Sequence, residues 1–321
     1  MPVALHNTLD AGDFGHAVLR GLAQPQKVVP ARYFYDRVGS DLFEAITALP
    51  EYYPTRTEIA LLRDHGSDIA AQVGSGRVVV EFGSGSSAKT PGFLRSVGAA
   101  AYVPIDISAE FLAMASADLA AKLPGLPVLP CAADFTKPFK LPPGVAGKPK
   151  LGFFPGSTLG NCTPRVAVDL LRAFAAVLGD GAWLVIGLDL AKDRARLEAA
   201  YNDSAGVTAA FNRNVAVRIN AELGGTIDLE ALAHEAVWNA DEGRIEMHLR
   251  AVRDTGFDVL GERFTMTAGE TIHTENSYKW TPEQARLLAR ASGWAPAAMW
   301  FDDAQLFGIH LWRSAPGLLE P

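Results

Sequence analysis

The feature that most constrains the fold is an alternation of short apolar runs and helix-length segments, which begins at Val78. Parallel strands need crossover connections of this length, and the crossover helices cover both faces of the sheet. The sequence therefore predicts an α/β domain built on a parallel sheet. Strands are expected at 78–82, 102–107, 127–131, 150–154 and 183–190, and the clearest helices at 109–122 and 164–178.

The end of the chain continues this pattern and adds a different closing element. A helix is expected to begin with Thr281 as N-cap and Pro282 in its first turn, and to end at Gly293. Two apolar runs, 298–301 and 307–313, then form a predicted antiparallel hairpin. A helix followed by an antiparallel pair at the end of the sheet resembles the class I methyltransferase fold.

Between these two parts the pattern changes. Residues from about 192 to 239 are expected to be mostly helical, whereas 244–253 and 264–273 alternate as antiparallel strands do when one face is wet. We therefore expect an insertion that joins the aromatic-rich N-terminal segment in a second, α+β domain. The expected division is a Rossmann-like domain over 58–192 and 280–321, and a second domain over 1–57 and 193–279.

The composition limits the classes of partner. The chain has 321 residues, a net charge of −7 and no basic run, so nucleic acid is not an expected partner. It has no apolar stretch of about 18 residues and no signal-peptide pattern, so no contact with a membrane is expected. Two cysteines do not make a disulfide framework, and a cytoplasmic location fits them best. The seven histidines never lie three or four residues apart, so no metal is expected.

A glycine turn and two acids mark the ends of the first three predicted strands. Gly83 lies in a Gly-Ser-Gly turn, where glycine lets the backbone approach a ligand closely. Asp106 ends the next strand about twenty residues later, where an acid can bind ribose hydroxyls. Asp134 and Phe135 follow the third strand and suit an adenine amino group and ring. Ligands of open α/β sheets bind at this carboxyl edge, so an adenosine-type ligand is predicted.

The loop favours S-adenosylmethionine over a dinucleotide. The third glycine of a dinucleotide loop, which brings a helix N-terminus against pyrophosphate, is absent. Glu81 before the turn suits a cationic sulfonium, and Lys89 suits a methionyl carboxylate. A dehydrogenase remains the less favoured alternative, and each residue taken singly also fits a structural reading, Asp106 as a helix cap and Lys89 as a solvated lysine.

Longer motifs carry a more specific resemblance. From about residue 28 onward the chain is similar to the histidine Nα-methyltransferases of ergothioneine biosynthesis. In that family, S-adenosylmethionine methylates the α-amine of L-histidine three times to give hercynine. The motifs that carry the resemblance are ARYFYDRVGSDLFEAITALPEYYPTRTE, VVEFGSGSSAKT, GSTLGNCTP, YNDSAGVTAAFNRN, RIEMHLRA and HTENS.

The resemblance implies a role for each matched position. Asn161 and Tyr52 are the expected catalytic residues. Tyr52 matches a histidine-binding position, and Asn161 and Tyr201 are expected to hold the amine and the carboxylate of the substrate. The imidazole is expected to be read in the Glu275-Asn276-Ser277 segment. The S-adenosylmethionine residues are expected to be Tyr35, Gly83, Lys89, Asp106, Asp134 and Phe135. The second domain is expected to bind the substrate, L-histidine, and the chain is expected to be a monomer.

Small departures from the family pattern keep two alternatives open. The loop has GSGSS where GSGTS is common, Pro155 precedes GST, and Asn276 stands where an apolar residue can occur. Without the resemblance, Asn161 fits the cap of the next helix equally well. The alternatives are an Nα-methyltransferase for another amino acid, such as tryptophan, and a non-catalytic S-adenosylmethionine-binding module.

Overall fold

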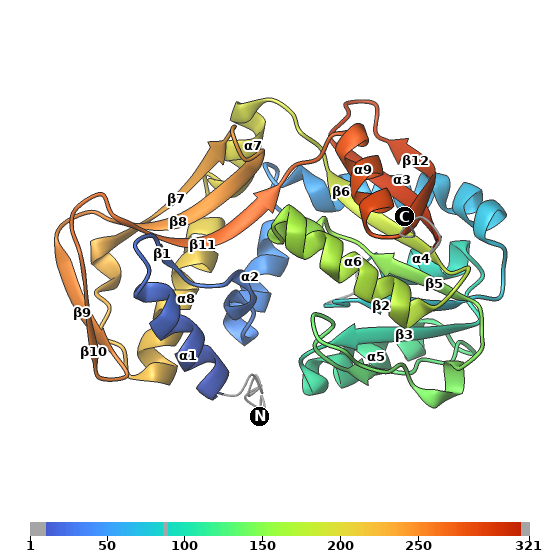
Figure 1. Ribbon diagram of the computed structural model, residues 1–321, viewed down its shortest axis with the longest axis horizontal. Helices are drawn as coiled ribbons and strands as arrows, with labels where there is room; N and C mark the ends of the chain where they lie inside the picture. Colours follow the sequence, from blue (N-terminus) through green and yellow to red (C-terminus); the bar gives the residue numbers. More distant parts are fainter. Residues whose placement is uncertain (1–10, 86–88, 316–321) are drawn as a thin grey trace. The chain divides into compact units, whose positions relative to one another are not determined.

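The computed structural model describes residues 11–85 and 89–315, which divide into two compact units (Figure 1). Unit 1 combines the N-terminal segment up to Tyr53 with Lys192–Tyr278. Unit 2 combines Pro54–Ala191 with the segment that begins at Lys279. Each unit is therefore assembled from two separate stretches of sequence.

Unit 2 contains a seven-stranded sheet in the order β12-β13-β6-β5-β2-β3-β4. Only β13 runs antiparallel to its neighbours, and the other pairings are parallel. The sheet confirms the predicted α/β class I fold with an antiparallel hairpin at its end. Its strands are β2 (Val78–Phe82), β3 (Ala101–Asp106), β4 (Cys131–Ala132), β5 (Lys150–Phe154), β6 (Trp183–Asp189), β12 (Trp294–Phe301) and β13 (Phe307–Ser314).

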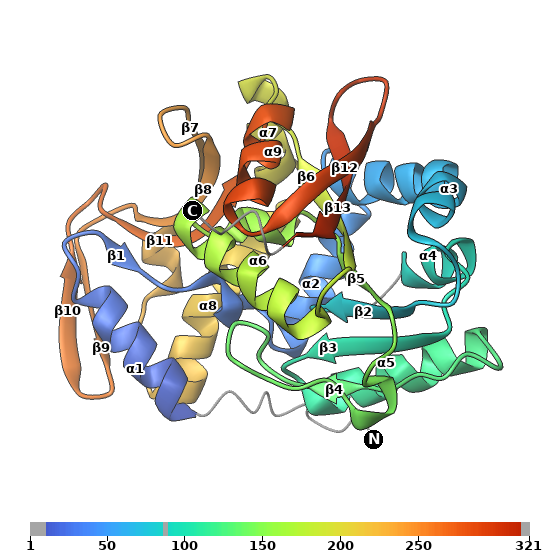
Figure 2. The same cartoon turned by 45° about the vertical axis from the view of Figure 1, so that its right-hand side comes forward.

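Helices cover both faces of this sheet (Figure 2). On one face Leu61, Phe93 and Leu119, from three helices, join a buried cluster with strand residues such as Val79. On the other face the rings of Phe82 and Phe174 stack at 3.7 Å. The first face carries α3 (Tyr53–Val73), α4 (Thr90–Ser96) and α5 (Ala109–Lys122), and the second carries α6 (Pro164–Leu178) and α9 (Pro282–Ala291).

Local signals were accurate where they depend on a few neighbouring residues. At the start of α9, Gln284 N donates to the Thr281 hydroxyl (3.2 Å) and Thr281 N donates to the Gln284 side chain (2.9 Å), which is a capping box. The strand expected at 127–131 is only partly formed, because β4 contains Cys131 and Ala132 and, before it, Val128 makes an isolated parallel bridge with Tyr102. Pro127 and Pro130 lack the backbone N–H that a ladder requires.

Unit 1 is built on a four-stranded sheet in the order β1-β11-β8-β7, antiparallel except for the parallel β1–β11 pair. Its inner face buries Met247 and Leu249 against α8, which contributes Phe211 and Ile219. The elements are α1 (Ala11–Leu22), β1 (Lys27–Val28), η1 (Ala31–Phe34), α2 (Arg37–Thr47), α7 (Arg194–Tyr201), α8 (Val207–Leu223), η4 (Leu229–Ala231), β7 (Leu232–Asn239), β8 (Arg244–Ala251), β9 (Thr255–Val259), β10 (Glu262–Met266) and β11 (Thr271–Tyr278).

Two predictions for unit 1 were wrong in detail. The segment expected to be helical up to residue 239 ends in strand β7, and the strand expected at 264–273 is two strands joined by a turn. Residues LAHEAVWN of β7 have no strong local strand signal, and their conformation depends on pairing with β8 along its whole length. As a result, β11 extends to Tyr278 and includes the Glu275-Asn276-Ser277 segment.

The described residues also bear on membrane and disulfide chemistry. None of the helices in these ranges has the length and apolar content needed to cross a bilayer. Cys131 and Cys162 are both free thiols. Burial raises the pKa of Cys162 to about 11, so this thiol is unreactive at neutral pH.

Candidate active site

The glycine loop after β2 has the backbone that the sequence predicts. Gly83 has φ of 73° and Gly85 has φ of 46°, in the left-handed region that favours glycine. A Cβ at Gly83 would lie 3.3 Å from the ring of Phe135, whereas a Cβ at Gly85 would meet nothing within 4 Å. The loop is tied to β3, because Gly83 N and Ser84 N both donate to Ile105 O. Ser86 and Ser87 follow the turn in the sequence, where serine could cap the next helix, but they lie outside the described residues.

The two predicted acids lie at the ends of neighbouring strands of unit 2. Asp106 accepts from Gly85 N (3.3 Å) and Ser108 N (3.1 Å), so it fastens the glycine loop as well as the turn before α5. Asp134 accepts from Thr136 N at 3.0 Å. Burial alone would raise the pKa of Asp134, but hydrogen bonds from Thr136 and Lys137 outweigh it and lower the pKa. Asp134 is therefore an anion that can accept from an adenine amino group.

Phe135 belongs to an aromatic cluster next to the loop. Its ring centroid lies 6.4 Å from that of Phe82 and 6.0 Å from those of Phe154 and Phe174. The residue is only partly buried. The cluster therefore holds the ring beside Gly83 while part of it stays open to a planar ligand.

Lys89 is held by a buried acid that the sequence analysis missed. Its amine forms an ion pair with Glu58 of α3, whose side chain is fully buried. Both Glu58 carboxylate oxygens accept from Gly156 N, at 2.8 and 3.0 Å. A Cβ at Gly187 of β6 would lie 2.0 Å from Glu58 Oε1, so glycine there leaves room for the carboxylate. Glu58 thus joins the start of α4 to the loop after β5.

A signal for Glu58 was present in the sequence. Leu61 and Leu62 lie three and four residues after it, and both are buried in the core that α3 forms with the sheet. Residues at this spacing share one helix face. An acid at a core position of an amphipathic helix needs a partner, which could have identified it.

The loop after β5 presents Asn161 through a strained turn. Ser157 has φ of 55°, unusual for a residue other than glycine, and its hydroxyl accepts from Asp189 N at 2.9 Å. Gly160 N donates to Ser157 O at 2.8 Å. Asn161 ends the short helix η3 (Thr158–Asn161), and its side chain makes no hydrogen bond within the described ranges. Since Thr163 is the N-cap of α6, Asn161 does not cap that helix.

Glu81 lies near the end of β2, and its carboxylate is hydrogen-bonded to other residues of unit 2. The carboxylate is 1% exposed and accepts from Thr90 Oγ1 (2.9 Å) and Tyr102 OH (2.5 Å). Burial raises its pKa to about 7, although Tyr102, Thr90 and Lys89 act in the opposite direction. The folded protein therefore binds this proton more tightly than the unfolded chain does.

The raised pKa of Glu81 predicts a pH dependence of stability. The stabilisation is complete below about pH 4.5 and is lost as the pH rises through about 7. The unfolding free energy of the wild type, measured against that of Glu81→Gln by urea titration, should fall by about 2–3 kcal/mol between pH 5 and pH 8. A difference that stays constant over this range would contradict the assignment.

Unit 1 gathers the predicted tyrosines. The rings of Tyr52 and Tyr201 meet edge to face at 6.2 Å, and Phe43 contacts Tyr52 at 6.3 Å and Tyr35 at 5.7 Å. Tyr201 OH lies 2.7 Å from Ser277 Oγ. Residues from α2, α7 and β11 and the segments next to α2 thus form one polar-edged aromatic cluster.

Tyr35 lies among the predicted substrate residues. Although 37% of its surface is exposed, burial of its hydroxyl raises its pKa well above 10, and Glu275, Tyr52 and Tyr201 add to this effect. Tyr35 is therefore a protonated donor at neutral pH, not a base. The sequence predicted it for the cofactor, but within its unit it accompanies Tyr52, Tyr201 and Glu275.

The Glu275-Asn276-Ser277 segment presents its side chains to two faces of β11. Glu275 pairs with Met247 and Ser277 pairs with Ile245, both on the inner face of the sheet. Successive strand residues point to opposite faces, so Asn276, which pairs with Glu246, lies on the outer face. Glu275 and Ser277 are therefore brought together with Tyr201, and Asn276 is not.

Comparison with known proteins identifies the family of this chain. A family model described as "Histidine-specific methyltransferase, SAM-dependent" matches residues 14–314. The chain is 41% identical to the histidine N-alpha-methyltransferase of Mycolicibacterium smegmatis and 39% identical to that of Mycobacterium tuberculosis, in each case over 97% of this chain and 99% of the relative. It is 31% identical to ergothioneine biosynthesis protein 1 of Neurospora crassa, over 88% of this chain and 33% of that protein. The chain belongs to the family of histidine-specific, S-adenosylmethionine-dependent methyltransferases.

Proposed function

We propose that this protein transfers three methyl groups from S-adenosylmethionine to the α-amine of L-histidine, giving hercynine, the first step of ergothioneine biosynthesis. The observation that carries the proposal is the similarity to two histidine N-alpha-methyltransferases, which are 41% and 39% identical to this chain over nearly its full length. The arrangement of Tyr52, Tyr201, Ser277 and Glu275 in one unit supports it, because these groups suit a small amino acid with an imidazole.

The chemistry needs a neutral amine held in line with the sulfonium methyl group. The nitrogen lone pair forms the new N–C bond while the C–S bond breaks, and its electrons return to sulfur to leave S-adenosylhomocysteine. The ammonium formed in the first two transfers then loses a proton. A nearby sulfonium and desolvation both lower the pKa of the substrate amine, so positioning supplies much of the rate and no strong base is required.

Asn161 suits the reacting end of histidine. Its amide oxygen accepts a hydrogen bond from the amine, which directs the nitrogen lone pair, while its NH₂ donates to the carboxylate. Tyr52 and Tyr201 donate to the same carboxylate without adding charge. Glu275 accepts from an imidazole N–H, with Ser277 beside it, and Asn276 remains a predicted contact that faces the other side of the strand.

The cofactor half of the mechanism lies in the strand ends of unit 2. We assign the ribose to Asp106, the adenine amino group to Asp134 and the adenine ring to Phe135. Gly83 allows the backbone to approach the ligand, and Lys89 binds the methionyl carboxylate. Tyr35, as a protonated phenol, completes the predicted set as a hydrogen-bond donor.

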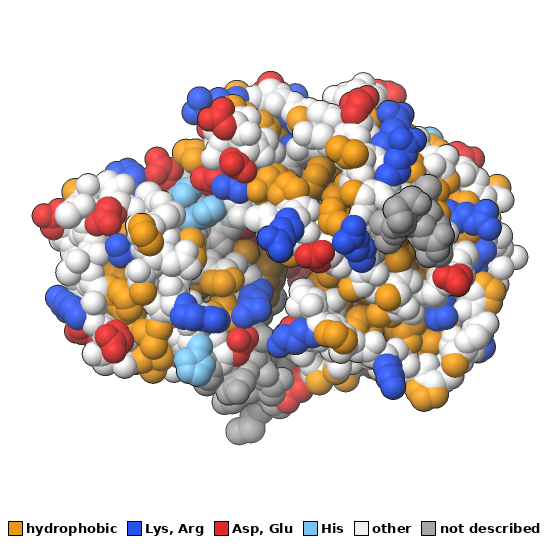
Figure 3. Space-filling model, viewed as in Figure 1, with side chains coloured by type: hydrophobic (Ala, Val, Ile, Leu, Met, Phe, Trp, Pro, Cys, Tyr) orange, Lys and Arg blue, Asp and Glu red, His pale blue; other side chains and the backbone are white. Residues whose placement is uncertain are grey.

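For partners and location we propose a cytoplasmic monomer that acts on a free amino acid and not on nucleic acid or a membrane. Acidic and basic side chains are interspersed on the face drawn in Figure 3, and its coloured residues form no continuous basic surface. Free thiols at Cys131 and Cys162 suit a reducing compartment. The methyl transfer itself uses no metal.

The test is incubation of the purified chain with S-adenosylmethionine and a panel of amino acids, with products resolved by mass. We expect mono-, di- and trimethylated histidine in sequence. Methylation of tryptophan or another amino acid in preference to histidine would support the alternative substrate. Cofactor binding in a calorimeter without turnover of any amino acid would support a non-catalytic module.

Substitution of Glu275 tests how the imidazole is read. Glu275→Gln should lower kcat/KM for L-histidine by about 10–100-fold, because the imidazole N–H then donates to a neutral amide oxygen and the negative charge of the acceptor is lost. Turnover of an aromatic amino acid without an imidazole should change far less. Glu235→Gln is the matched control, since Glu235 lies in β7 of the same sheet and pairs with Arg250. Equal losses for both substrates would refute the assigned role.

A further inference from the structure

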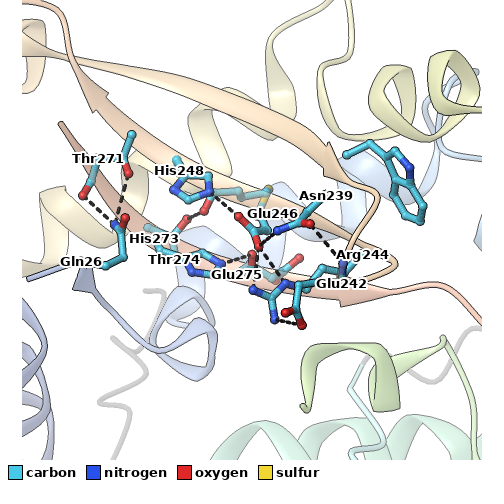
Figure 4. A network of polar contacts seen from close by, with 12 residues as sticks. Gln26, Asn239, Glu242, Arg244, Glu246, His248, Thr271, His273, Thr274 and Glu275 are labelled. Atoms are coloured by element: carbon cyan, nitrogen blue, oxygen red, sulfur yellow. Dashed lines mark hydrogen bonds and ion pairs between the residues drawn. The ribbon is translucent and has the colours of Figure 1, made fainter. Parts of the chain in front are cut away.

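The outer face of the unit 1 sheet gathers an acid and two histidines from two strands (Figure 4). Glu246 and His248 lie two residues apart on β8, so they share a face, and His273 of β11 is the direct cross-strand partner of His248. One donor atom from each residue lies within 4.8 Å of the others. The sequence showed no such motif, because 24 residues separate His248 from His273 and only strand pairing brings them together.

Glu246 is held so that one of its oxygens faces the histidines. Its Oε1 accepts from Asn239 Nδ2 (2.9 Å) and Arg244 Nε (2.8 Å), while Oε2 lies 3.1 Å from His248 Nε2. These contacts orient the carboxylate, with one oxygen toward the imidazole of His248, before any ligand arrives.

The two imidazoles have complementary free positions. His273 Nε2 lies 3.0 Å from the backbone oxygen of Glu275, which can only accept, so Nε2 carries the proton and Nδ1 carries the lone pair. This is the hydrogen bond that metal-binding histidines commonly make through their second nitrogen. His248 is 8% exposed, and its Nδ1 is buried with no hydrogen-bond partner within the described ranges.

We propose that Glu246, His248 and His273 bind one divalent transition-metal ion of the Zn²⁺ class. Two imidazoles and one carboxylate suit Zn²⁺ and its neighbours, whereas Ca²⁺ and Mg²⁺ prefer sites made of oxygen. Three protein ligands leave a fourth position for water, and the partial exposure of Glu246 and His273 gives an ion access. The site is independent of the proposed methyl transfer.

Binding requires one ring to turn. The two imidazoles now stack, with centroids 4.7 Å apart and planes 22° apart, whereas a metal lies in the plane of each ring that binds it. His248 is the ring that turns, because among the described residues its side chain hydrogen-bonds only to Glu246, and the ion replaces that contact. His273 keeps its bond to Glu275 O and offers Nδ1. A change in the orientation of His248 on addition of the ion would therefore distinguish a metal site from two imidazoles that only stack.

The test uses tag-free, chelator-stripped protein titrated with Zn²⁺ in a calorimeter and with Co²⁺ by visible absorption and paramagnetic NMR. We expect one ion per chain, with imidazole N–H signals from two ligands in the Co²⁺ complex. His248→Gln, His273→Gln and Glu246→Gln should each weaken binding by more than about tenfold. His65→Gln is the matched control, since His65 pairs with Asp68 (3.2 Å) elsewhere in the chain.

Thermal unfolding with and without Zn²⁺ guards against variants that fold poorly. Zn²⁺ should raise the Tm of the wild type and of His65→Gln but not of the three site variants. The wild type alone can overturn the proposal: absence of binding, or a Co²⁺ complex without two histidine ligands, refutes it. Binding that survives all three substitutions also refutes it.

Discussion

Glu58→Gln is expected to lower the free energy of unfolding by about 3–5 kcal/mol, because it leaves Lys89 without its buried counter-charge. The Glu58 side chain is fully buried, and that of Lys89 is 16% exposed, so water cannot replace the lost partner efficiently. Urea unfolding at neutral pH measures the change. Lys89→Met should be similarly harmful, since it strands the glutamate.

The double variant Glu58→Gln, Lys89→Met separates pairing from packing. If the two charges act as a pair, removing both should cost clearly less than the sum of the single losses. Affinity for S-adenosylhomocysteine, measured by calorimetry, should fall in both single variants. Glu58→Gln weakens the contact with Gly156 N, and Lys89→Met removes the proposed partner of the methionyl carboxylate. Additive losses, or a Glu58→Gln variant within about 1 kcal/mol of wild type, would contradict the role of this ion pair.

Asn161→Ala is expected to reduce kcat/KM for L-histidine by about 10²–10³-fold while leaving the fold unchanged. The loss reflects a reacting amine that is no longer oriented toward the methyl group. Because its side chain makes no hydrogen bond within the described ranges, stability should change by no more than about 0.5 kcal/mol. Steady-state kinetics and urea unfolding of the same preparation measure the two effects.

Two controls define the Asn161 result. Affinity for S-adenosylhomocysteine should stay near the wild-type value, which shows that the cofactor half is intact. Asn161→Asp keeps the size and one acceptor oxygen but cannot donate to the substrate carboxylate, and its charge repels that group, so it should not restore activity. Activity of Asn161→Ala within tenfold of wild type would remove this residue from the proposed mechanism.

The parts of the fold that could be predicted are those with short-range causes. The strand before Gly83 and the capping box at Thr281 each depend on residues a few positions apart. The α/β class followed from the spacing of apolar runs, because crossover helices have a characteristic length. The predicted site residues came from motifs. In unit 2, Asp106 ends β3 and Asp134 follows β4, so both lie at the carboxyl ends of strands.

The parts that were missed have long-range causes. Strand β7 was expected to be helical from its local sequence. It is a strand because its pairing with β8 outweighs that local propensity. The faces of Glu275 and Asn276 could not be assigned, since the register depends on a bulge between His273 and Glu275. In unit 1 the neighbours of Tyr35 come from several segments, which no local pattern reports.

The sequence by itself determined the class of fold and predicted a glycine loop for the cofactor and a set of polar residues for a small amino acid, because each depends on local spacing or on a motif. Only the tertiary structure decided which charges are buried and with whom. Glu58 meets Lys89 and Gly156 N, and Glu246 meets two histidines, because helix packing and strand register bring distant residues together. Burial in turn decides the chemistry, since the cost of an unpaired charge depends on the water around it.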